Sequence, residues 1–251
     1  MGVTVNTTAR FSGNLVVWLD GDDLDGDGSA EGSGESGLVA GNVSHWMNKA
    51  DSGSLSYASP VKAASGTQYP NLATNSMNSR ATVSFDGGDH LLLNENLDLR
   101  NATIFLVFSA DVLDSNDFIL STYSDSNNDI RVISSAFNHL ITEGGATAVS
   151  SSNTITATSN YVYSAVCGAS SFKDFLNGTS VSTDASTEGW NNIDARLNNL
   201  GLGARVDNSG SPTRYFDGRI AEIRIYDSNL SDADRQTIES ALGTKWGITI
   251  P

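Results

Sequence analysis

The sequence is poor in several residue types, and each shortage excludes a class of protein. Cys167 is the single cysteine in 251 residues, so no intramolecular disulfide can form, and its apolar neighbours predict a buried thiol. Only 14 Lys and Arg stand against 29 Asp and Glu, and the net charge of −15 disfavours nucleic acid and anionic membranes as partners. No apolar run approaches the roughly 20 residues that a membrane-spanning helix needs, so no membrane insertion is expected. The three histidines are scattered and do not recur at zinc spacing.

Short β-rich runs separated by clusters of Gly, Asn, Asp and Ser dominate the chain. The clearest runs are Leu15–Leu19, Ala81–Phe85, Thr103–Phe108, Phe118–Tyr123, Ile130–Ser134, Tyr161–Val166, Phe172–Leu176 and Arg219–Tyr226. Asn177-Gly178 predicts a tight hairpin, because both residues tolerate positive φ. Long polar segments at 49–79 and 143–153 are predicted as loops. Strands do not alternate with long helices, so the sequence predicts an antiparallel two-sheet sandwich rather than a parallel α/β sheet.

One helix is predicted, near the C-terminal end of the sequence. Ser231 can cap a helix over Asp232–Leu242, and Gly243 is expected to end it. Trp246 follows the last turn and is expected to anchor the helix on the sandwich. Trp18 and Trp46 are predicted to be core residues.

The acidic run from Asp20 to Gly28 suggests a metal loop. Asp23, Asp25 and Asp27 followed by Gly28 reproduce the D-x-D-x-D-G opening of a calcium loop, in which alternate carboxylates converge. The twelfth position is Gly34 instead of the usual Glu, and the preceding segment reads as a strand. Two interpretations remain open, a lone calcium loop in a β-protein or a solvated acidic hairpin tip. For calcium (Ca2+), the predicted ligands are Asp20, Asp22, Asp23, Asp25, Asp27, Ser29 and Glu31. A weaker D-x-N-x-D spacing occurs at Asp125, Asn127 and Asp129.

Several motifs occur in an order that resembles a known family. They are Leu19-Asp20 through Gly28, Val43-Ser44-His45-Trp46, Ala81 through Asp89, Phe175 through Thr179, Leu200-Gly201-Leu202-Gly203, Gly218 through Tyr226, and Leu230-Ser231. From about residue 13 the chain resembles laminin G-like jelly-roll domains of bacterial extracellular proteins, within the concanavalin A-like lectin/glucanase superfamily. In the loop after Trp46 the family often has an aspartate before the lysine, but Asn48 precedes Lys49 here, which weakens any carry-over of a polar contact from this loop.

The resemblance implies an all-β fold, an antiparallel two-sheet jelly-roll β-sandwich (concanavalin A-like) with one short C-terminal helix. Residues 13–251 would form this domain, and residues 1–12 would be an N-terminal linker or an expression remnant. No signal peptide is visible at the start, as expected for one domain of a larger secreted or cell-surface chain. Members of the family are commonly modules of adhesins or polysaccharide-degrading enzymes. Many bind glycans and many hold calcium.

The residues for catalysis in this superfamily are absent from the sequence. Its retaining glucanases carry E-x-D-x-x-E on one strand, and no glutamate here fits that pattern. The lyase-like Q-[IV]-H strand and a G-x-S-x-G elbow are also missing. Glu222 is interpreted as a strand glutamate satisfied by hydrogen bonds, with a catalytic acid as the alternative. No catalytic residue is therefore predicted.

A sugar site needs an aromatic plate for the apolar face of a pyranose and polar groups for its hydroxyls. The predicted glycan-binding residues are Trp190, Asn191, Asn192, Arg205, Asp207, Asn208 and Tyr215. The leading hypothesis is a non-catalytic, calcium-stabilised carbohydrate-binding domain, with a glycan or polysaccharide as partner. A structural or protein-docking module without a sugar site and a divergent glycoside hydrolase or polysaccharide lyase are the alternatives.

Overall fold

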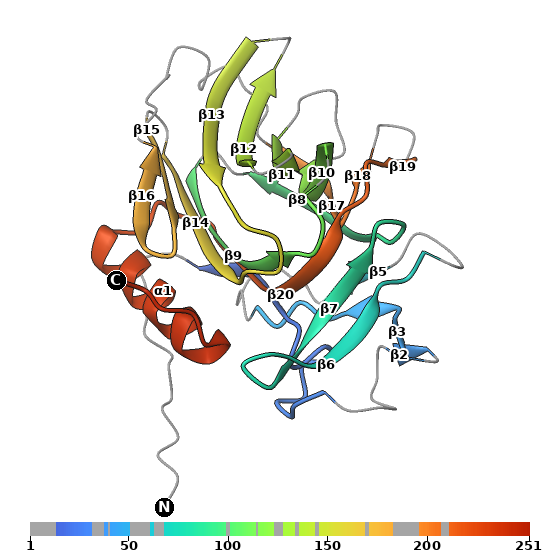
Figure 1. The fold of residues 1–251 in the computed structure, drawn as a ribbon. Helices are drawn as coiled ribbons and strands as arrows, with labels where there is room; N and C mark the ends of the chain where they lie inside the picture. The colour runs from blue at the N-terminus through green and yellow to red at the C-terminus, as the bar shows by residue number, and fades with distance from the viewer. Residues whose placement is uncertain are drawn as a thin grey trace, which may run out of the picture.

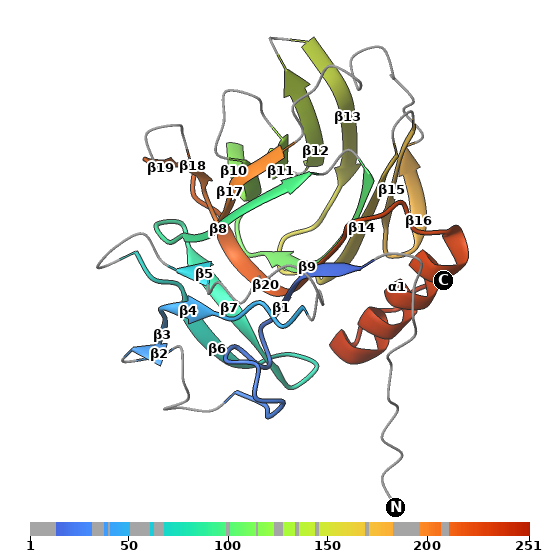
Figure 2. The ribbon, with the colours of Figure 1, turned by 180° about the vertical axis from the view of Figure 1, so that it is seen from behind.

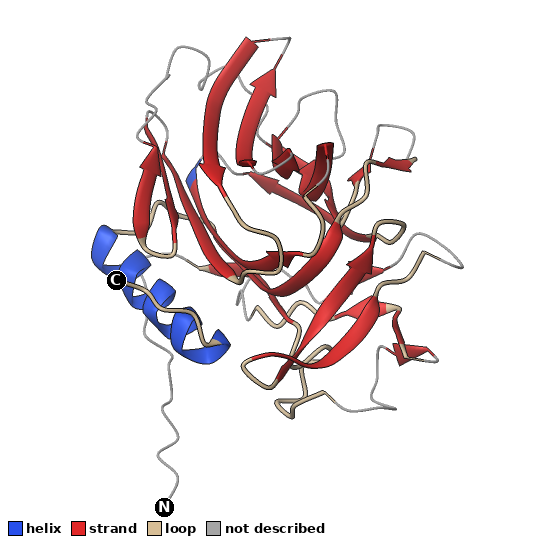
Figure 3. Cartoon of the chain, in the orientation of Figure 1, coloured by secondary structure: helices blue, strands red, loops and turns tan. Residues whose placement is uncertain are grey.

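The computed structural model describes residues 14–31, 38–39, 41–50, 61–62, 68–98, 101–113, 115–122, 128–133, 136–143, 146–168, 171–182, 196–206 and 211–251. These residues form two large antiparallel sheets and one helix (Figure 1, Figure 3). This is the all-β, antiparallel fold class that the sequence predicts. The predicted linker, residues 1–12, lies outside the described residues.

Among the described residues, the first sheet has ten strands. Its order is β16 (Thr179–Ser182), β15 (Ser171–Leu176), β14 (Tyr161–Gly168), β9 (Ala102–Ala110), β20 (Asp217–Tyr226), β7 (Arg80–Asp86), β6 (Asn71–Met77), β3 (Asn42–Val43) and β2 (Leu38–Val39), and β1 (Leu15–Asp20) also pairs with β20. The second sheet has eight, β13 (Ala146–Thr154), β12 (Ala136–Glu143), β11 (Asn128–Ile133), β10 (Ser115–Thr122), β17 (Arg196–Leu202), β8 (Leu91–Asp98), β5 (Val61–Lys62) and β4 (His45–Trp46). A separate short hairpin joins β18 (Arg205–Val206) to β19 (Pro212–Thr213).

All eight predicted strands are present, and so is the predicted tight hairpin. Asn177 and Gly178 have φ of 49° and 76° between β15 and β16, as a two-residue turn of that hand requires. The two predicted loops are partly wrong, because β6 lies within 49–79 and β13 occupies most of 143–153. Both strands are rich in Asn, Ser and Thr, so their composition does not predict strands. They form because β6 pairs with β7 and β13 pairs with β12 in the folded chain.

The core is built on both faces of β9, in which every residue is buried. Ile104, Leu106 and Phe108 belong to the cluster between the sheets, whereas Phe105 and Val107 belong to the cluster beneath the helix. Because side chains alternate along a strand, one strand can serve two cores when both its faces are covered.

Helix α1 (Asp232–Trp246) covers the outer face of the first sheet beside β14 and β9 (Figure 1, Figure 2). Ser231 caps it as predicted, and Trp246 is fully buried against the sheet. The predicted end at Gly243 is wrong, since the left-handed cap is Gly247 with φ of 70°. Gly243 instead allows close packing, because a Cβ there would lie 2.6 Å from the carbonyl oxygen of Ile248. No helix in the described part of the chain has the length and apolarity needed to cross a membrane.

Candidate functional site

The acidic loop starts where two strands meet end to end along β20. β7 pairs with the first part of β20 and β1 with the last part, and a β-bulge lies between Ile220 and Glu222. The Gly21 N–H donates to the Ala221 carbonyl at 2.8 Å. A Cβ on Gly21 would lie 2.9 Å from that oxygen and 3.2 Å from Thr82 Cα, so only glycine fits this junction.

Asp20 and Asp22 are held by cations of the protein itself. Asp20 Oδ2 accepts from Lys245 Nζ at 2.7 Å and from Lys49 Nζ at 3.3 Å. Burial, together with the charge of Glu222, raises the pKa of Asp20, and the two lysines oppose that shift. Asp22 accepts from Arg80 Nη1 at 2.5 Å and from the Ala81 N–H at 2.9 Å. These two predicted ligands therefore fasten the start of the loop to β7 and α1.

The next three aspartates converge. One carboxylate oxygen from each of Asp23, Asp25 and Asp27 lies within 4.8 Å of the others. Asp25 Oδ1 accepts from the Asp27 N–H at 3.2 Å, and Asp27 Oδ1 accepts from the Ser29 N–H at 2.7 Å. Gly26 and Gly28, at φ of 75° and 87°, allow this curl. Three carboxylates at such separations suit a hard divalent cation with oxygen ligands.

The burial of Asp23 distinguishes this cluster from a solvated hairpin tip. The residue is only 5% exposed, and its Oδ1 is buried without a hydrogen-bond partner among the described residues. Its Oδ2 accepts from the Gly28 N–H at 3.2 Å and from Lys49 Nζ. A buried carboxylate oxygen without a donor is costly, and a bound cation would remove that cost.

Glu31 and Ser29 shape the base and the rim of the loop. Glu31 Oε1 accepts from the Leu24 N–H, and the Glu31 N–H donates to the Asp22 carbonyl at 3.1 Å. Leu24, which is fully buried, anchors the middle of the loop in the core. Ser29 lies on the exposed side of the loop. The Glu31 side chain thus closes the loop by accepting from the loop's own backbone at Leu24.

Lys49 is a site residue that the sequence did not reveal. The loop after Trp46, where the departure from the family pattern weakens any carry-over of a polar contact, does supply such contacts, since Asn48 bonds the backbone of β1 and Lys49 bonds both Asp20 and Asp23. Lys49 is 26 residues from Asp23, and no local pattern connects the two. The order of the strands brings them together.

Glu222 is fully buried and bonded on both carboxylate oxygens, as the hydrogen-bonded interpretation predicts. Oε1 accepts from Trp18 Nε1 at 2.9 Å and from Arg224 Nε at 2.7 Å. Oε2 accepts from Lys245 Nζ at 2.8 Å and from Trp246 Nε1 at 2.7 Å. Burial alone would raise the pKa of Glu222, but the charges of Arg224 and Lys245 and these hydrogen bonds lower it to about 2. Such a carboxylate stays ionised and cannot serve as a general acid near neutral pH.

Trp18 is half-buried instead of forming part of the core. Its ring lies 4.4 Å from Lys49 Nζ and 5.0 Å from the Arg224 guanidinium carbon, so two cations contact its π surface. Trp46 is fully buried, as predicted. Trp18 therefore belongs to the charged network between the acidic loop and α1.

Two of the predicted glycan-binding residues lie within the described chain. Arg205, in β18, pairs with Thr213 of β19, and Tyr215 follows two residues later. The Tyr215 hydroxyl accepts from Gln68 Nε2 at 3.0 Å and donates to the Pro212 carbonyl at 3.3 Å. Trp190, Asn191, Asn192, Asp207 and Asn208 lie outside the described residues, as do Asp125 and Asn127.

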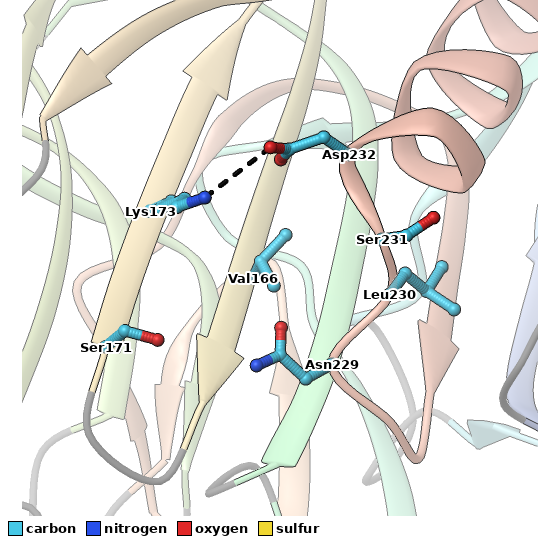
Figure 4. Close-up of a pocket in the computed structure, with 7 residues that line it drawn as sticks. All are labelled: Val166, Ser171, Lys173, Asn229, Leu230, Ser231 and Asp232. Carbon is cyan, nitrogen blue, oxygen red and sulfur yellow. Dashed lines mark ion pairs between the residues drawn. The ribbon is translucent and has the colours of Figure 1, made fainter.

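A hollow of sugar size lies elsewhere, between β14, β15 and the start of α1 (Figure 4). Its volume is about 330 Å³, within the range of small-molecule sites. The lining residues are Val166, Ser171, Lys173, Asn229, Leu230, Ser231 and Asp232. Lys173 Nζ lies 3.6 Å from Asp232 Oδ2 across the hollow, and both side chains are largely exposed. The lining offers hydroxyl, amide and charged groups but no aromatic plate.

The sequence comparisons give a family and no curated relative. Residues 85–234 match a laminin G family model described as concanavalin A-like lectin/glucanases superfamily. The matched segment includes β9, β14 and β20 and does not reach the acidic loop. No curated protein matches the sequence.

Solved structures of the same fold include two sugar-binding modules. The CBM40 domain of the Ruminococcus gnavus IT-sialidase is 13% identical with a TM-score of 0.51, over 61% of this chain and 93% of that one. Domain 4 of AbnA, an extracellular arabinanase of Geobacillus stearothermophilus, is 14% identical with a TM-score of 0.57, over 88% and 96% of the two chains. The receptor-binding domain of botulinum neurotoxin type G is 10% identical with a TM-score of 0.61, and this chain covers 51% of it. At these identities the likeness establishes the fold.

Proposed function

The chain belongs to the concanavalin A-like lectin/glucanase superfamily, and we propose that it is a non-catalytic, calcium-stabilised carbohydrate-binding domain of a secreted bacterial adhesin or polysaccharide-processing protein. The binding role is supported by the fold's sugar-binding relatives. The CBM40 domain has been solved with α2,3-sialyllactose and the arabinanase domain with arabinotriose. The non-catalytic role is supported by Glu222, because its ion pairs keep its pKa near 2.

The calcium part of the proposal is supported by Oδ1 of Asp23, which is buried and has no hydrogen-bond partner among the described residues. Asp23, Asp25 and Asp27 would be the carboxylate ligands, because their oxygens already converge. Asp20 and Asp22, predicted as ligands, would instead support the loop through Lys245 and Arg80. Calcium bound there would offset two of the three carboxylate charges and hold the curl of the loop.

A melting experiment tests the calcium part. At calcium a hundred times above the dissociation constant, about 2.7 kcal/mol of stabilisation should raise the melting temperature by roughly 5–10 °C over chelator. Asp25→Asn combined with Asp27→Asn should abolish the shift, whereas Asp232→Asn, an exposed carboxylate on α1, should keep it. Equal melting temperatures of the native chain in calcium and chelator would refute the stabilising ion.

A glycan array, read with calcium and again with chelator, tests the sugar part. Two surfaces can be separated by single variants. Trp190→Ala and Arg205→Ala should remove binding if the predicted loops hold the sugar, and Lys173→Ala should remove it if the hollow beside α1 does. No signal on any glycan, with stability still linked to calcium, would favour the structural or protein-docking alternative. Release of reducing ends or unsaturated products from polysaccharides would instead favour an enzyme.

A further inference from the structure

Lys49 lies between the three converging aspartates and the charged network beneath α1. Its N–H donates to the Trp18 carbonyl at 2.8 Å, which fixes the backbone next to β1. Its side chain is only 14% exposed and runs under the loop, with Cγ 3.5 Å from the place where a Cβ on Gly26 would be. The ammonium contacts Asp23 Oδ2 on one side and Asp20 Oδ2, at 3.3 Å, on the other.

The ammonium neutralises only part of the cluster. One positive charge is shared between Asp20 and Asp23, while Asp25, Asp27 and the buried Oδ1 of Asp23 receive no contact from it. Burial disfavours its charge, but the hydrogen bond to Asp23 and the charges of Asp20 and Asp23 outweigh this and raise the pKa of Lys49.

A divalent cation and this ammonium would compete for one carboxylate. Two positive charges that share Asp23 repel each other strongly in a partly buried site. Lys49 also has other stabilising contacts, because Asp20 Oδ2 and the face of Trp18, 4.4 Å away, both lie within its reach. A small movement would give up Asp23 and keep these two partners.

We propose that Lys49 competes with a divalent cation for Asp23. Its ammonium is bonded to Asp23 when no divalent cation is bound, and it moves to Asp20 and the Trp18 ring when one binds. The proposal rests on the proposed calcium site. It makes the calcium affinity of the loop depend on a residue that is not a ligand. It also connects ion binding to α1, since Asp20 is bonded to Lys245 of the helix.

Calorimetric titration of calcium into chelator-treated protein tests the proposal. Lys49→Met removes the competing charge and retains most of the chain length, so it should bind calcium roughly five-fold more tightly or better. Lys173→Met, the matched loss of an exposed lysine, should leave the dissociation constant unchanged. Lys49→Arg keeps the charge and should not tighten binding. If Lys49→Met proves unstable, Lys49→Gln makes the same comparison.

The outcomes separate this inference from the calcium proposal. Unchanged or weaker binding by a folded, neutral Lys49 variant would overturn the inference, because Lys49 would then be a support of the loop. Binding by the neutral variant alone would support the competition and refute calcium stabilisation of the native chain. Failure of every variant to bind would overturn both.

Discussion

At the scale of single residues, Glu222 joins three parts of the molecule that are distant in sequence. It accepts from Trp18 of β1, Arg224 of β20, and Lys245 and Trp246 of α1. Removing one partner of a buried charge network is expensive, because the remaining charges stay buried without compensation. The carboxylate is therefore a structural counter-charge.

Replacement of this carboxylate should destabilise the fold strongly. Glu222→Gln keeps the size but leaves Arg224 and Lys245 facing a neutral amide, so the free energy of unfolding should fall by about 3–5 kcal/mol. Urea denaturation measures the change. Asp232→Asn, an exposed partner of Lys173, should cost less than about 1 kcal/mol. A loss below about 1 kcal/mol in Glu222→Gln would mean that the network contributes little.

At the scale of elements, the turn from β17 to β18 depends on close packing against β7. Gly203 has φ of 77°, and a Cβ there would lie 2.2 Å from Phe85 Cδ1. Phe85 is buried in the core between the sheets, so the ring cannot withdraw without disturbing its neighbours. The turn needs glycine for space as well as for backbone conformation.

Two glycine variants separate these requirements. Gly203→Ala should cost about 3 kcal/mol or more, because backbone strain adds to overpacking. Gly41→Ala has a similar φ of 87° with no atom within 4 Å of the new Cβ, so it should cost only about 1 kcal/mol of strain. Denaturant midpoints of the two variants give the comparison. Equal losses would show that conformation alone requires the glycine.

At the scale of the whole molecule, acidic groups crowd more than one region. Asp86 of β7 is paired directly across from Asp217 of β20, and the Asp86 N–H donates to Asp89 Oδ2 at 3.2 Å. Burial, and then the side-chain hydrogen bond and the charge of Asp86, raise the pKa of Asp89 to about 7, although the bond from the Asp86 backbone N–H opposes the shift. Burial and the charges of Asp111 and Asp86 raise the pKa of Asp217. These groups add to the repulsion expected from a net charge of −15.

The pH dependence of stability should therefore have a maximum on the acidic side of neutrality. Between its unperturbed pKa of 3.8 and about 7, Asp89 binds a proton in the folded state only, so stability falls as the pH rises through this range. Glu222 acts in the opposite sense, with stability lost as the pH falls from 4.5 towards 2. Melting temperatures at about pH 2, 4 and 8 should be highest near pH 4, where the folded state keeps most of both contributions. Asp89→Asn should reduce the fall between about pH 4 and 8, and an undiminished fall would exclude Asp89 as its source.

Much of the local structure follows from the sequence alone. Short β-rich runs predicted the central strands, Asn177-Gly178 predicted the hairpin, and Ser231 predicted the start of α1, because each signal acts over a few residues. The spacing of Asp23, Asp25 and Asp27 likewise predicted their convergence. The helix end was wrong because Gly243 serves packing, and β6 and β13 were missed because their strand partners specify them.

The division of the acidic residues between those paired with the protein's own cations and those that converge depends on the tertiary structure. Local spacing cannot report that Asp20 faces Lys245 or that Asp22 faces Arg80, since 225 and 58 residues separate these partners. The pairing of β1 and β7 against β20 creates those contacts, and it places Lys49 on Asp23. Of the seven predicted ligands, Asp23, Asp25 and Asp27 converge beside the Lys49 ammonium, because long-range charge pairing depends on which strands are neighbours.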